Sequence, residues 1–282
     1  MKCFELNNKQ QIPAVGFGVF MIPNNGPTYD AVLAALKAGY RHIDTAAGYM
    51  NESDVGKAIK DSGINRSDIF ITSKLWLQDY GYENAKKGIE NSLEQLGVDY
   101  IDLYLLHQPY GDYLGAWKAL EEAVKEGKIK SIGISNITLN LWDKFKDGMS
   151  IMPVVNQVEF NPFVQQRELR KVMNKNNIRL EAWYPLGHGN KDLLENRTIL
   201  SLADKYNKNA GQIILRWIYQ EGVISLPKST NPERMKRNID IFDFELTDEE
   251  MQSIQILDTG KPTHNPEDLS NEKRLMSVKI HD

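Results

Sequence analysis

The chain of 282 residues is long enough for one large domain or two ordinary ones, and 41% hydrophobic, 26% charged and 9% aromatic residues are typical of a globular protein. Its formal net charge of −4 excludes a global field that would attract nucleic acid or an anionic membrane surface. No apolar run approaches the roughly 20 residues that a membrane-spanning helix needs. The one cysteine, Cys3, excludes an internal disulfide and a cysteine metal cluster.

The first residues of the chain are polar and carry no apolar core of a signal peptide. With a single cysteine, this favours the reducing cytoplasm as the location. No linker or low-complexity segment interrupts the sequence, so we expect residues 1–282 to form a single domain.

The chain opens with a predicted β-hairpin and continues with eight predicted strands. The hairpin spans Cys3 to Pro13, with Asn7-Asn8 at its centre. The eight strands are short, nearly unbroken apolar runs, which are typical of strands buried on both faces of a parallel sheet. They lie near Val15–Gly18, Tyr40–Ile43, Ile69–Thr72, Ile101–Leu106, Ile129–Ile134, Val154–Val158, Ile178–Ala182 and Val223–Leu226.

Amphipathic helical patterns separate these strands, and several of them stop at a glycine. The pattern that includes Ala31, Val32, Ala35 and Leu36 ends at Gly39. Comparable patterns end at Gly97, Gly127 and Gly222. The alternation of strands and helices predicts a parallel sheet, and at this length a closed (β/α)8 TIM barrel with the N-terminal hairpin capping its bottom.

The alternative fold is an open, doubly wound sheet. Such a sheet usually binds a nucleotide at a glycine-rich turn after its first strand. Gly16-Phe17-Gly18 supplies two of the glycines, but Met21 stands in place of the third. The fingerprint is incomplete, and this favours the barrel.

Polar side chains stand at the C-terminal ends of the predicted strands, where barrels of this kind place their active sites. Asp44 ends the second strand, Lys74 follows the third, and His107 ends the fourth. The next two strands carry further hydroxyl, amide and carboxyl groups, namely Ser135, Asn136, Asn156, Gln157 and Glu159.

Each of these residues also has a purely structural interpretation. Asp44 could cap backbone amides, and Lys74 could be a solvated loop residue. His107 could be a core histidine bonded to the backbone, and Tyr49 could pack at a loop-to-helix junction. A barrel, however, places the ends of its second, third and fourth strands side by side, which favours one shared site.

The four residues together make chemical sense. A tyrosine hydroxyl ordinarily has a pKa of about 10, too high for efficient proton donation near neutral pH. A neighbouring Lys74 cation would lower the pKa of Tyr49, and Asp44 would hold Lys74 in place. His107 could donate a hydrogen bond to a substrate carbonyl oxygen. No spacing typical of metal ligands is present, so we expect no metal.

At these residues the sequence resembles the aldo-keto reductase superfamily. The resemblance begins with Gly39 to Ala46, Tyr49 and Asn51-Glu52, and it extends from about Leu6 to Leu257. The further motifs follow in one order along the chain: Ile71 to Trp76, Leu105-Leu106-His107, Gly133 to Asn136, Pro153 to Pro162, Trp183 to Gly187 and Leu226 to Ser229. The short loops and tail resemble members related to diketogluconate and prostaglandin F reductases.

The resemblance implies an NADPH-dependent oxidoreductase that reduces aldehydes and ketones. Asp44, Tyr49, Lys74 and His107 would be the catalytic residues, with Tyr49 as the acid that protonates the carbonyl oxygen. The nicotinamide carboxamide would contact Ser135, Asn136 and Gln157, its ring would stack on Trp183, and the pyrophosphate would lie along Leu186 and Gly187.

The segment after the eighth strand has an independent physical argument. Lys228-Ser229-Thr230-Asn231 precedes Pro232-Glu233-Arg234, where proline at the first position starts a helix. A helix N-terminus flanked by Lys228 and Arg234 is typical of an anion site, which suits the extra 2′-phosphate of NADPH better than NADH. The structural alternative is an ordinary basic surface helix. By resemblance, Asn238 would contact adenine.

Two residues depart from the family pattern. Gln108 stands where many relatives carry tryptophan, and Arg237 where many carry an acidic residue near adenine. We expect Phe20, Trp76, His107 and Tyr110 to line the substrate pocket, although Phe20 could be an ordinary core aromatic.

Two other functions are alternatives to carbonyl reduction. One is an NADPH-binding regulatory or structural barrel with little turnover, and the other is a barrel of different chemistry, such as metal-assisted hydrolysis. The complete set of four catalytic candidates opposes the first, and the missing ligand clusters oppose the second. The short loops and tail offer no evident interface, so we expect a monomer.

Overall fold

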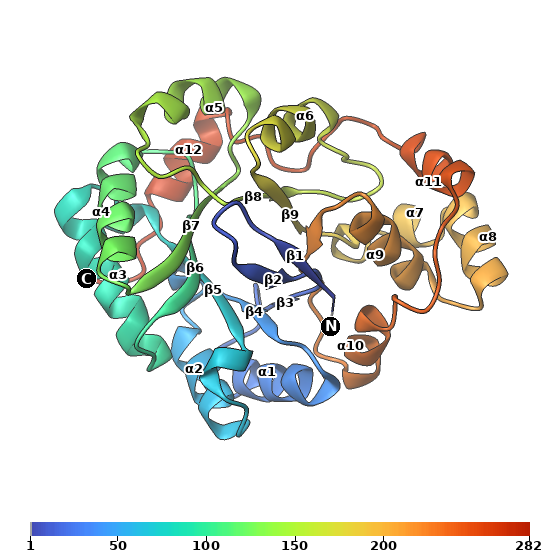
Figure 1. The fold of residues 1–282 in the computed structure, drawn as a ribbon, viewed down its shortest axis with the longest axis horizontal. Coiled ribbons are helices and arrows are strands. Elements are labelled where there is room, and N and C mark those ends of the chain that lie inside the picture. Colours follow the sequence, from blue (N-terminus) through green and yellow to red (C-terminus); the bar gives the residue numbers. More distant parts are fainter. Residues whose placement is uncertain (1) are drawn as a thin grey trace.

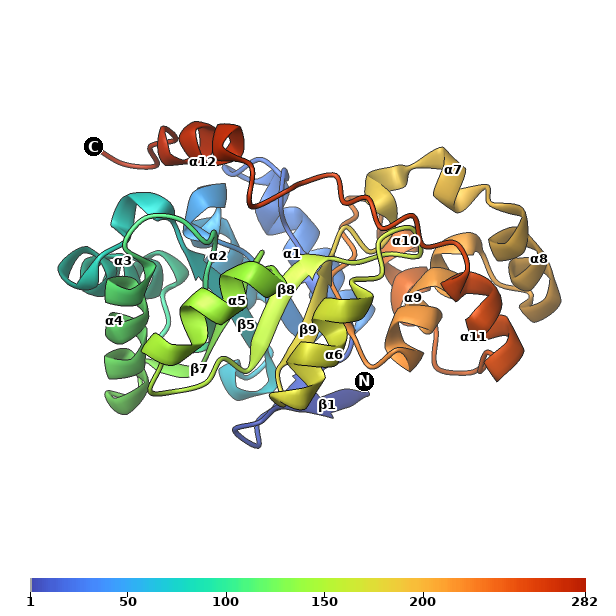
Figure 2. The same cartoon turned by 90° about the horizontal axis from the view of Figure 1, so that it is seen from above.

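A β-hairpin and a closed barrel make up the centre of the computed structural model, which describes residues 2–282. The hairpin consists of β1 (Cys3–Glu5) and β2 (Gln11–Pro13), which pair antiparallel. In Figure 1 the hairpin lies across the middle of the barrel, and Figure 2 shows it at one end, opposite the C-terminal segment.

Eight parallel strands form the second sheet, in the order β10-β9-β8-β7-β6-β5-β4-β3. A parallel bridge between Val15 and Ser225 joins the two outer strands and closes the sheet into a barrel. The strands are β3 (Phe17–Gly18), β4 (His42–Asp44), β5 (Phe70–Leu75), β6 (Ile101–Leu106), β7 (Ile129–Ser135), β8 (Val155–Glu159), β9 (Arg179–Trp183) and β10 (Ile224–Ser225). This confirms the predicted barrel and excludes the open sheet, because a closed sheet has no free edge.

Helices surround the barrel (Figure 1). The α-helices are α1 (Pro27–Ala38), α2 (Glu52–Asp61), α3 (Tyr82–Leu96), α4 (Tyr113–Lys125), α5 (Leu139–Phe145), α6 (Arg167–Lys175), α7 (Lys191–Leu194), α8 (Arg197–Tyr206), α9 (Ala210–Gln220), α10 (Pro232–Ile239), α11 (Asp248–Gln255) and α12 (Leu269–Met276). Short 3-10 turns are η1 (Ala47–Tyr49), η2 (Arg66–Asp68), η3 (Leu77–Asp79), η4 (Lys146–Gly148) and η5 (Gly187–Gly189). Gly39 ends α1 as predicted, because its φ of 110° turns the chain out of the helix.

The apolar core has two parts. The larger part lies between the sheet and the helices and includes Trp117 and Trp217, both fully buried. The smaller part fills the bottom of the barrel, where hairpin residues meet strand residues: Leu6, Ile12, Phe70, Leu103, Leu105, Val154, Val155 and Ile224. The hairpin therefore caps the bottom of the barrel, as predicted, and leaves the opposite end for the site.

One strand is longer than predicted. The third barrel strand, β5, continues past Thr72 and pairs with β6 up to the Leu75–Leu106 pair. Lys74 therefore lies inside the strand and opposite Leu105, rather than in the loop that follows it. This pairing fixes the backbone from which the lysine side chain extends.

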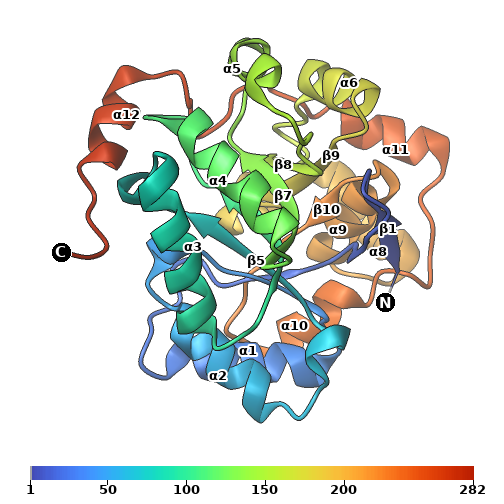
Figure 3. The ribbon, with the colours of Figure 1, turned by 60° about the vertical axis from the view of Figure 1, so that its left-hand side comes forward.

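The C-terminal segment crosses the end of the barrel opposite the hairpin (Figure 2). It ends in α12, on the side of the barrel that carries α3 and α4 (Figure 3). Several hydrogen bonds attach it to the loop after β5. Trp76 Nε1 donates to the Val278 carbonyl (2.9 Å), Gln78 Nε2 donates to the His281 carbonyl (2.9 Å), and Gln78 Oε1 accepts from the Ile280 backbone N–H (2.8 Å). No helix among residues 2–282 combines the length and apolar character needed to cross a membrane.

Candidate active site

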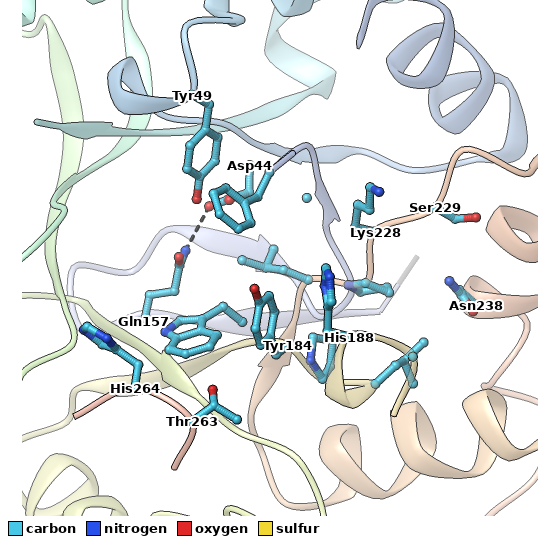
Figure 4. A pocket seen from close by; sticks show the side chains of 18 of the residues that line it. Asp44, Tyr49, Gln157, Tyr184, His188, Lys228, Ser229, Asn238, Thr263 and His264 are labelled. Atoms are coloured by element: carbon cyan, nitrogen blue, oxygen red, sulfur yellow. Dashed lines mark hydrogen bonds between the residues drawn. The ribbon is translucent and has the colours of Figure 1, made fainter. Parts of the chain in front are cut away.

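A cavity of about 1130 Å³ opens at the C-terminal ends of the barrel strands. Figure 4 shows side chains from distant parts of the chain pointing into it. The four catalytic candidates either line it or lie directly behind its wall. Asp44, Tyr49 and His107 contribute to the lining, whereas Lys74 is fully buried behind Asp44 and Tyr49.

A buried ion pair lies at the centre of the site. Lys74 Nζ donates to Asp44 Oδ1 (2.7 Å), to the Thr45 carbonyl (2.8 Å) and to the Tyr49 hydroxyl oxygen (3.3 Å). All three donors of the ammonium group are thus satisfied within the protein. The ammonium group is held at the tyrosine oxygen, where negative charge develops when the hydroxyl gives up its proton.

Tyr49 is placed by η1, which follows β4. Gly48 precedes it, and a Cβ atom at Gly48 would lie 2.7 Å from Trp76 Cε3, so the close approach of this turn to Trp76 requires glycine. The Tyr49 ring packs against Phe20 and His107, with ring centroids 5.0 and 5.4 Å away. The hydroxyl thereby stands between the ion pair and the cavity.

Burial and the neighbouring cation act on the tyrosine in opposite directions. Burial raises the pKa of Tyr49 to about 12, whereas Lys74 lowers it. The effect of Lys74 on the pKa of Tyr49 has the expected direction, but the effect of burial is larger, so the pKa rises. Burial also acts to lower the pKa of Lys74, yet Asp44 and Tyr49 reverse this and the net shift is upward. The lysine therefore stays charged, and the tyrosine keeps its proton at neutral pH.

His107 is held as a neutral imidazole. Burial, together with the Lys74 cation, lowers the pKa of His107 well below its ordinary value. Its ring packs edge-on against Tyr49 and Trp76, and its Nδ1 is buried without a hydrogen-bond partner. A neutral ring beside Tyr49 can donate a hydrogen bond to a carbonyl oxygen without competing for the tyrosine proton.

Gln157 links the ion pair to a second buried carboxyl group. Its Nε2 donates to Asp44 Oδ2 (2.9 Å), a bond drawn in Figure 4, and to Glu181 Oε2 (2.7 Å). With both amide hydrogens used inside the barrel, the Gln157 side chain has one defined orientation. Burial, and then Asp44, raise the pKa of Glu181 to about 8.

Three further candidates for cofactor contacts form a connected group. Trp183 Nε1 donates to Asn136 Oδ1 (2.9 Å), and Asn136 Nδ2 donates to Gln108 Oε1 (3.2 Å). Ser135 Oγ donates to the Gln157 carbonyl (2.9 Å). Gln108, the departure from the family pattern, therefore holds Asn136 in place, and the flat face of Trp183 is positioned before a ligand arrives.

Basic side chains gather at the other end of the cavity. Four residues proposed as cofactor contacts, Lys228, Ser229, Arg234 and Asn238, line it together with Arg237. Within residues 2–282 neither Lys228 nor Arg234 forms an ion pair, so both cations are available to an anion. This end suits the phosphates of NADPH, and the Trp183 end suits its nicotinamide ring.

The helix N-terminus contributes less to this end than predicted. α10 begins at Pro232 as expected, but Asn231 Oδ1 accepts hydrogen bonds from the backbone N–H groups of Glu233 (2.9 Å) and Arg234 (3.2 Å). Because these donors are already capped, an anion there depends on the side chains rather than on free backbone amides.

Two predicted contacts lie outside the cavity lining. Tyr110 is buried, and its hydroxyl group has no hydrogen-bond partner within the described residues. The next residue, Gly111, lies near Met276, so α12 covers this loop. Gly187 forms the turn between Leu186 and His188, both of which line the cavity. Phe20 and Trp76 line it as expected.

Several lining residues were not among the predicted site residues. Tyr184, His188, Lys191 and Asn209 come from the segments after β9, and Tyr184 has an unusual positive φ of 52° that directs it into the cavity (Figure 4). The C-terminal segment adds Thr263, His264, Arg274 and Leu275. The positive φ of Tyr184 is visible only in three dimensions, and the C-terminal residues follow the last recognisable motif.

Comparison with known proteins agrees with this geometry. Residues 15–259 match the model of the Aldo/keto reductase family. The chain is 46% identical to glyoxal reductase of Bacillus subtilis, covering 94% of this chain and 96% of that protein. It is 41% identical to methylglyoxal reductase DkgA of Escherichia coli, covering 91% and 94%. The structure resembles Bombyx mori aldo-keto reductase in complex with NADP, with a TM-score of 0.87, 35% identity and 96% of each chain covered.

The ion pair predicts a distinctive pattern of stabilities. Lys74→Met leaves the Asp44 carboxylate buried without its cation and should lower the free energy of unfolding by about 3–5 kcal/mol. The double variant Asp44→Asn, Lys74→Met carries no unpaired charge and should recover most of that loss. Urea unfolding of both variants measures this, and a double variant no more stable than Lys74→Met would contradict it.

Glu181 predicts a pH dependence of stability. Its pKa is raised from the ordinary 4.5 to about 8, so the folded protein holds a proton that the unfolded chain releases. The contribution of Glu181 to stability should therefore fall as the pH rises from about 4.5 to about 8. Glu181→Gln should be more stable than the wild type by about 2–4 kcal/mol near pH 9.

The same comparison near pH 3.5 is the internal control, because Glu181 is then protonated in both the folded and the unfolded chain and the difference should nearly vanish. Urea unfolding at a series of pH values measures it, with the exposed Glu168→Gln as a matched variant that should follow the wild type. A constant difference between Glu181→Gln and the wild type would contradict the assignment.

Proposed function

The chain belongs to the aldo/keto reductase family and is an NADP-dependent oxidoreductase, and we propose that it reduces small aldehydes, ketones and dicarbonyls with Tyr49 as the acid. The observation that carries this proposal is the Lys74 ammonium group, paired with Asp44 and 3.3 Å from the Tyr49 oxygen beside the cavity. Glyoxal and methylglyoxal reductases among its relatives support small dicarbonyls as substrates.

The residues of the cavity fit NADPH. Lys228, Ser229 and Arg234 would hold its phosphates, and Asn238 the adenine. The nicotinamide would lie on Trp183 and within reach of Ser135, Asn136 and Gln157. Bound in this way, NADPH supplies the hydride that reduces the carbonyl carbon.

The protein supplies the proton and the orientation. His107 donates a hydrogen bond to the carbonyl oxygen and directs it towards Tyr49. The Tyr49 hydroxyl gives its proton to that oxygen as the carbon is reduced, so an alcohol forms and a tyrosinate remains. Lys74 stabilises the tyrosinate, and solvent entering the open cavity returns the proton. Phe20 and Trp76 form an aromatic wall beside the reacting carbon.

Two further parts of the proposal concern the protein as a whole. We propose that residues 1–282 act as a single domain, since the hairpin packs into the bottom of the barrel and the C-terminal segment lines the cavity at its other end. We also propose that it acts as a monomer, because the complete set of catalytic candidates comes from one chain.

If Tyr49 is the acid, removing its hydroxyl should lower turnover without weakening NADPH binding. Tyr49→Phe should lower kcat about 100-fold or more while the Kd for NADPH stays unchanged. Steady-state NADPH oxidation with methylglyoxal and fluorescence titration of NADPH measure the two quantities. Tyr110→Phe removes a nearby hydroxyl that has no hydrogen bond and should retain wild-type turnover.

Full turnover by Tyr49→Phe would show that another group donates the proton. If the wild type bound NADPH tightly but reduced no aldehyde, ketone or dicarbonyl, a regulatory barrel would explain the protein better.

The basic end of the cavity predicts cofactor preference. Arg234→Ala should raise the Kd for NADPH about tenfold and leave the Kd for NADH nearly unchanged, because only NADPH carries the 2′-phosphate. Lys236→Ala, on the same helix but paired with Glu233 and outside the cavity lining, is the matched control and should change neither constant. Equal weakening of both cofactors would contradict the assignment.

A further inference from the structure

A carboxyl group in the interior of the barrel lacks a cation within the described residues. Glu181 lies on β9, and its side chain is fully buried. Its Oε2 accepts a hydrogen bond from Gln157 Nε2 (2.7 Å), but its Oε1 has no hydrogen-bond partner among residues 2–282. Buried polar atoms are nearly always hydrogen-bonded, and an unpaired carboxylate is costly to bury. The reaction described above gives this group no role.

The strands around Glu181 leave it uncharged rather than paired. Burial raises the pKa of Glu181 to about 8, and Asp44 on β4 acts in the same direction. Lys74 on β5 lowers the pKa of Glu181, but its ammonium group is bonded to Asp44. His42 Nε2, also on β4, lies 3.8 Å from Glu181 Oε1, yet burial lowers the pKa of His42 to about 3 and the ring is neutral. At neutral pH the Glu181 carboxyl group therefore keeps its proton.

Glu181 lies one layer of side chains below the wall of the cavity. It pairs in register with Gln157 on β8 and with Ile224 on β10, both uncharged. Trp183 follows two positions later on β9, so the two side chains share one face of the strand and lie about 6–7 Å apart along it. Gln157 and Trp183 line the cavity, and they are the proposed contacts of the nicotinamide carboxamide and ring. Glu181 is therefore the carboxyl group beneath the proposed position of the ring.

We propose that Glu181 determines the preference of the protein between the two redox states of its cofactor. It keeps its proton while the uncharged ring of NADPH is bound, and it releases the proton to solvent when the positively charged ring of NADP⁺ binds. The inference rests on the proposed function, because it needs the ring to lie at Trp183 and Gln157. It needs no particular carbonyl substrate.

The oxidised ring supplies the cation that the barrel interior lacks. A positive charge near a buried carboxyl group stabilises its ionised form and lowers its pKa. NADPH carries the same phosphates but no charge on its ring, so it should not ionise Glu181. A ligand that favours the ionised group binds more tightly once that group is ionised. The affinity for NADP⁺ should therefore rise with pH up to about 8, the pKa of Glu181 in the free protein, and stay level above it.

Cofactor binding in the absence of substrate tests the inference. We would measure the Kd for NADP⁺ and the Kd for NADPH by calorimetry from about pH 6 to about pH 9. For the wild type, the Kd for NADP⁺ divided by that for NADPH should fall about tenfold between about pH 6 and about pH 8. This ratio removes the titration of the phosphate groups, which both cofactors share. In buffers of different ionisation enthalpy at neutral pH, NADP⁺ should release about half a proton more than NADPH.

Variants assign the effect to one carboxyl group. Glu181→Gln keeps the shape of the side chain but cannot ionise, so its Kd ratio should stay constant with pH. Glu181→Met, which cannot ionise either, should behave in the same way. Glu52→Gln is the matched control: burial raises the pKa of Glu52 to about 7, but its carboxylate is bonded to Ser73 and Ser92, between β5 and α3 and outside the cavity lining. This variant should keep the pH dependence of the wild type.

The outcomes separate the inference from the proposed reaction. A constant Kd ratio in the wild type, or a pH dependence that survives in Glu181→Gln, would overturn the inference and leave carbonyl reduction standing. Loss of the pH dependence in Glu52→Gln would also overturn it. A protein that shows the expected ratios but reduces no carbonyl compound would support the inference and contradict the proposed reaction. If neither cofactor bound, both would be overturned.

Discussion

The buried ion pair between Lys74 and Asp44 is the constraint on which the site depends. A lysine with no exposed surface would lose its charge, but Asp44, the Thr45 carbonyl and the Tyr49 oxygen supply a partner for each of its donors. The pair exists only because β4 and β5 run parallel as neighbours and bring their C-terminal ends together. The fold that closes the barrel therefore also places the Lys74 cation beside the Tyr49 hydroxyl. Gln157, which lines the cavity, is held in turn by its hydrogen bond to Asp44.

The reactivity of Tyr49 comes from a balance of opposed effects. Burial holds its proton, and the adjacent cation favours release, so the phenol is protonated at rest and its charge is stabilised only while the proton is being transferred. The same logic applies to His107, which burial keeps neutral. The connected side chains of Gln108, Asn136 and Trp183 add an ordered surface that needs little rearrangement when a flat ring binds.

The sequence was sufficient to predict the barrel, because parallel strands appear as apolar runs, and to predict which side chains lie at the C-terminal ends of its strands. It could not predict the balance at Tyr49, since burial is a property of the packed structure. It also placed Tyr110 in the pocket, whereas α12 covers that loop. The sequence could not predict that His264 and Arg274 line the cavity. Their segment has no periodic apolar pattern, and it contacts residues of the barrel that lie about two hundred positions earlier in the sequence.

The attachment of the C-terminal segment has an evolutionary consequence. At Val278, Ile280 and His281, the barrel binds the segment through main-chain atoms. Side chains attach the segment as well, because His281 Nε2 lies 2.8 Å from Asp79 Oδ1 and Glu267 accepts a hydrogen bond from Asn140 Nδ2 (3.0 Å). Substitutions between these anchoring residues therefore alter the roof of the cavity and leave its attachment in place. A change of side chains between the anchors is therefore a route by which such a barrel changes the compounds it accepts while its catalytic interior stays the same.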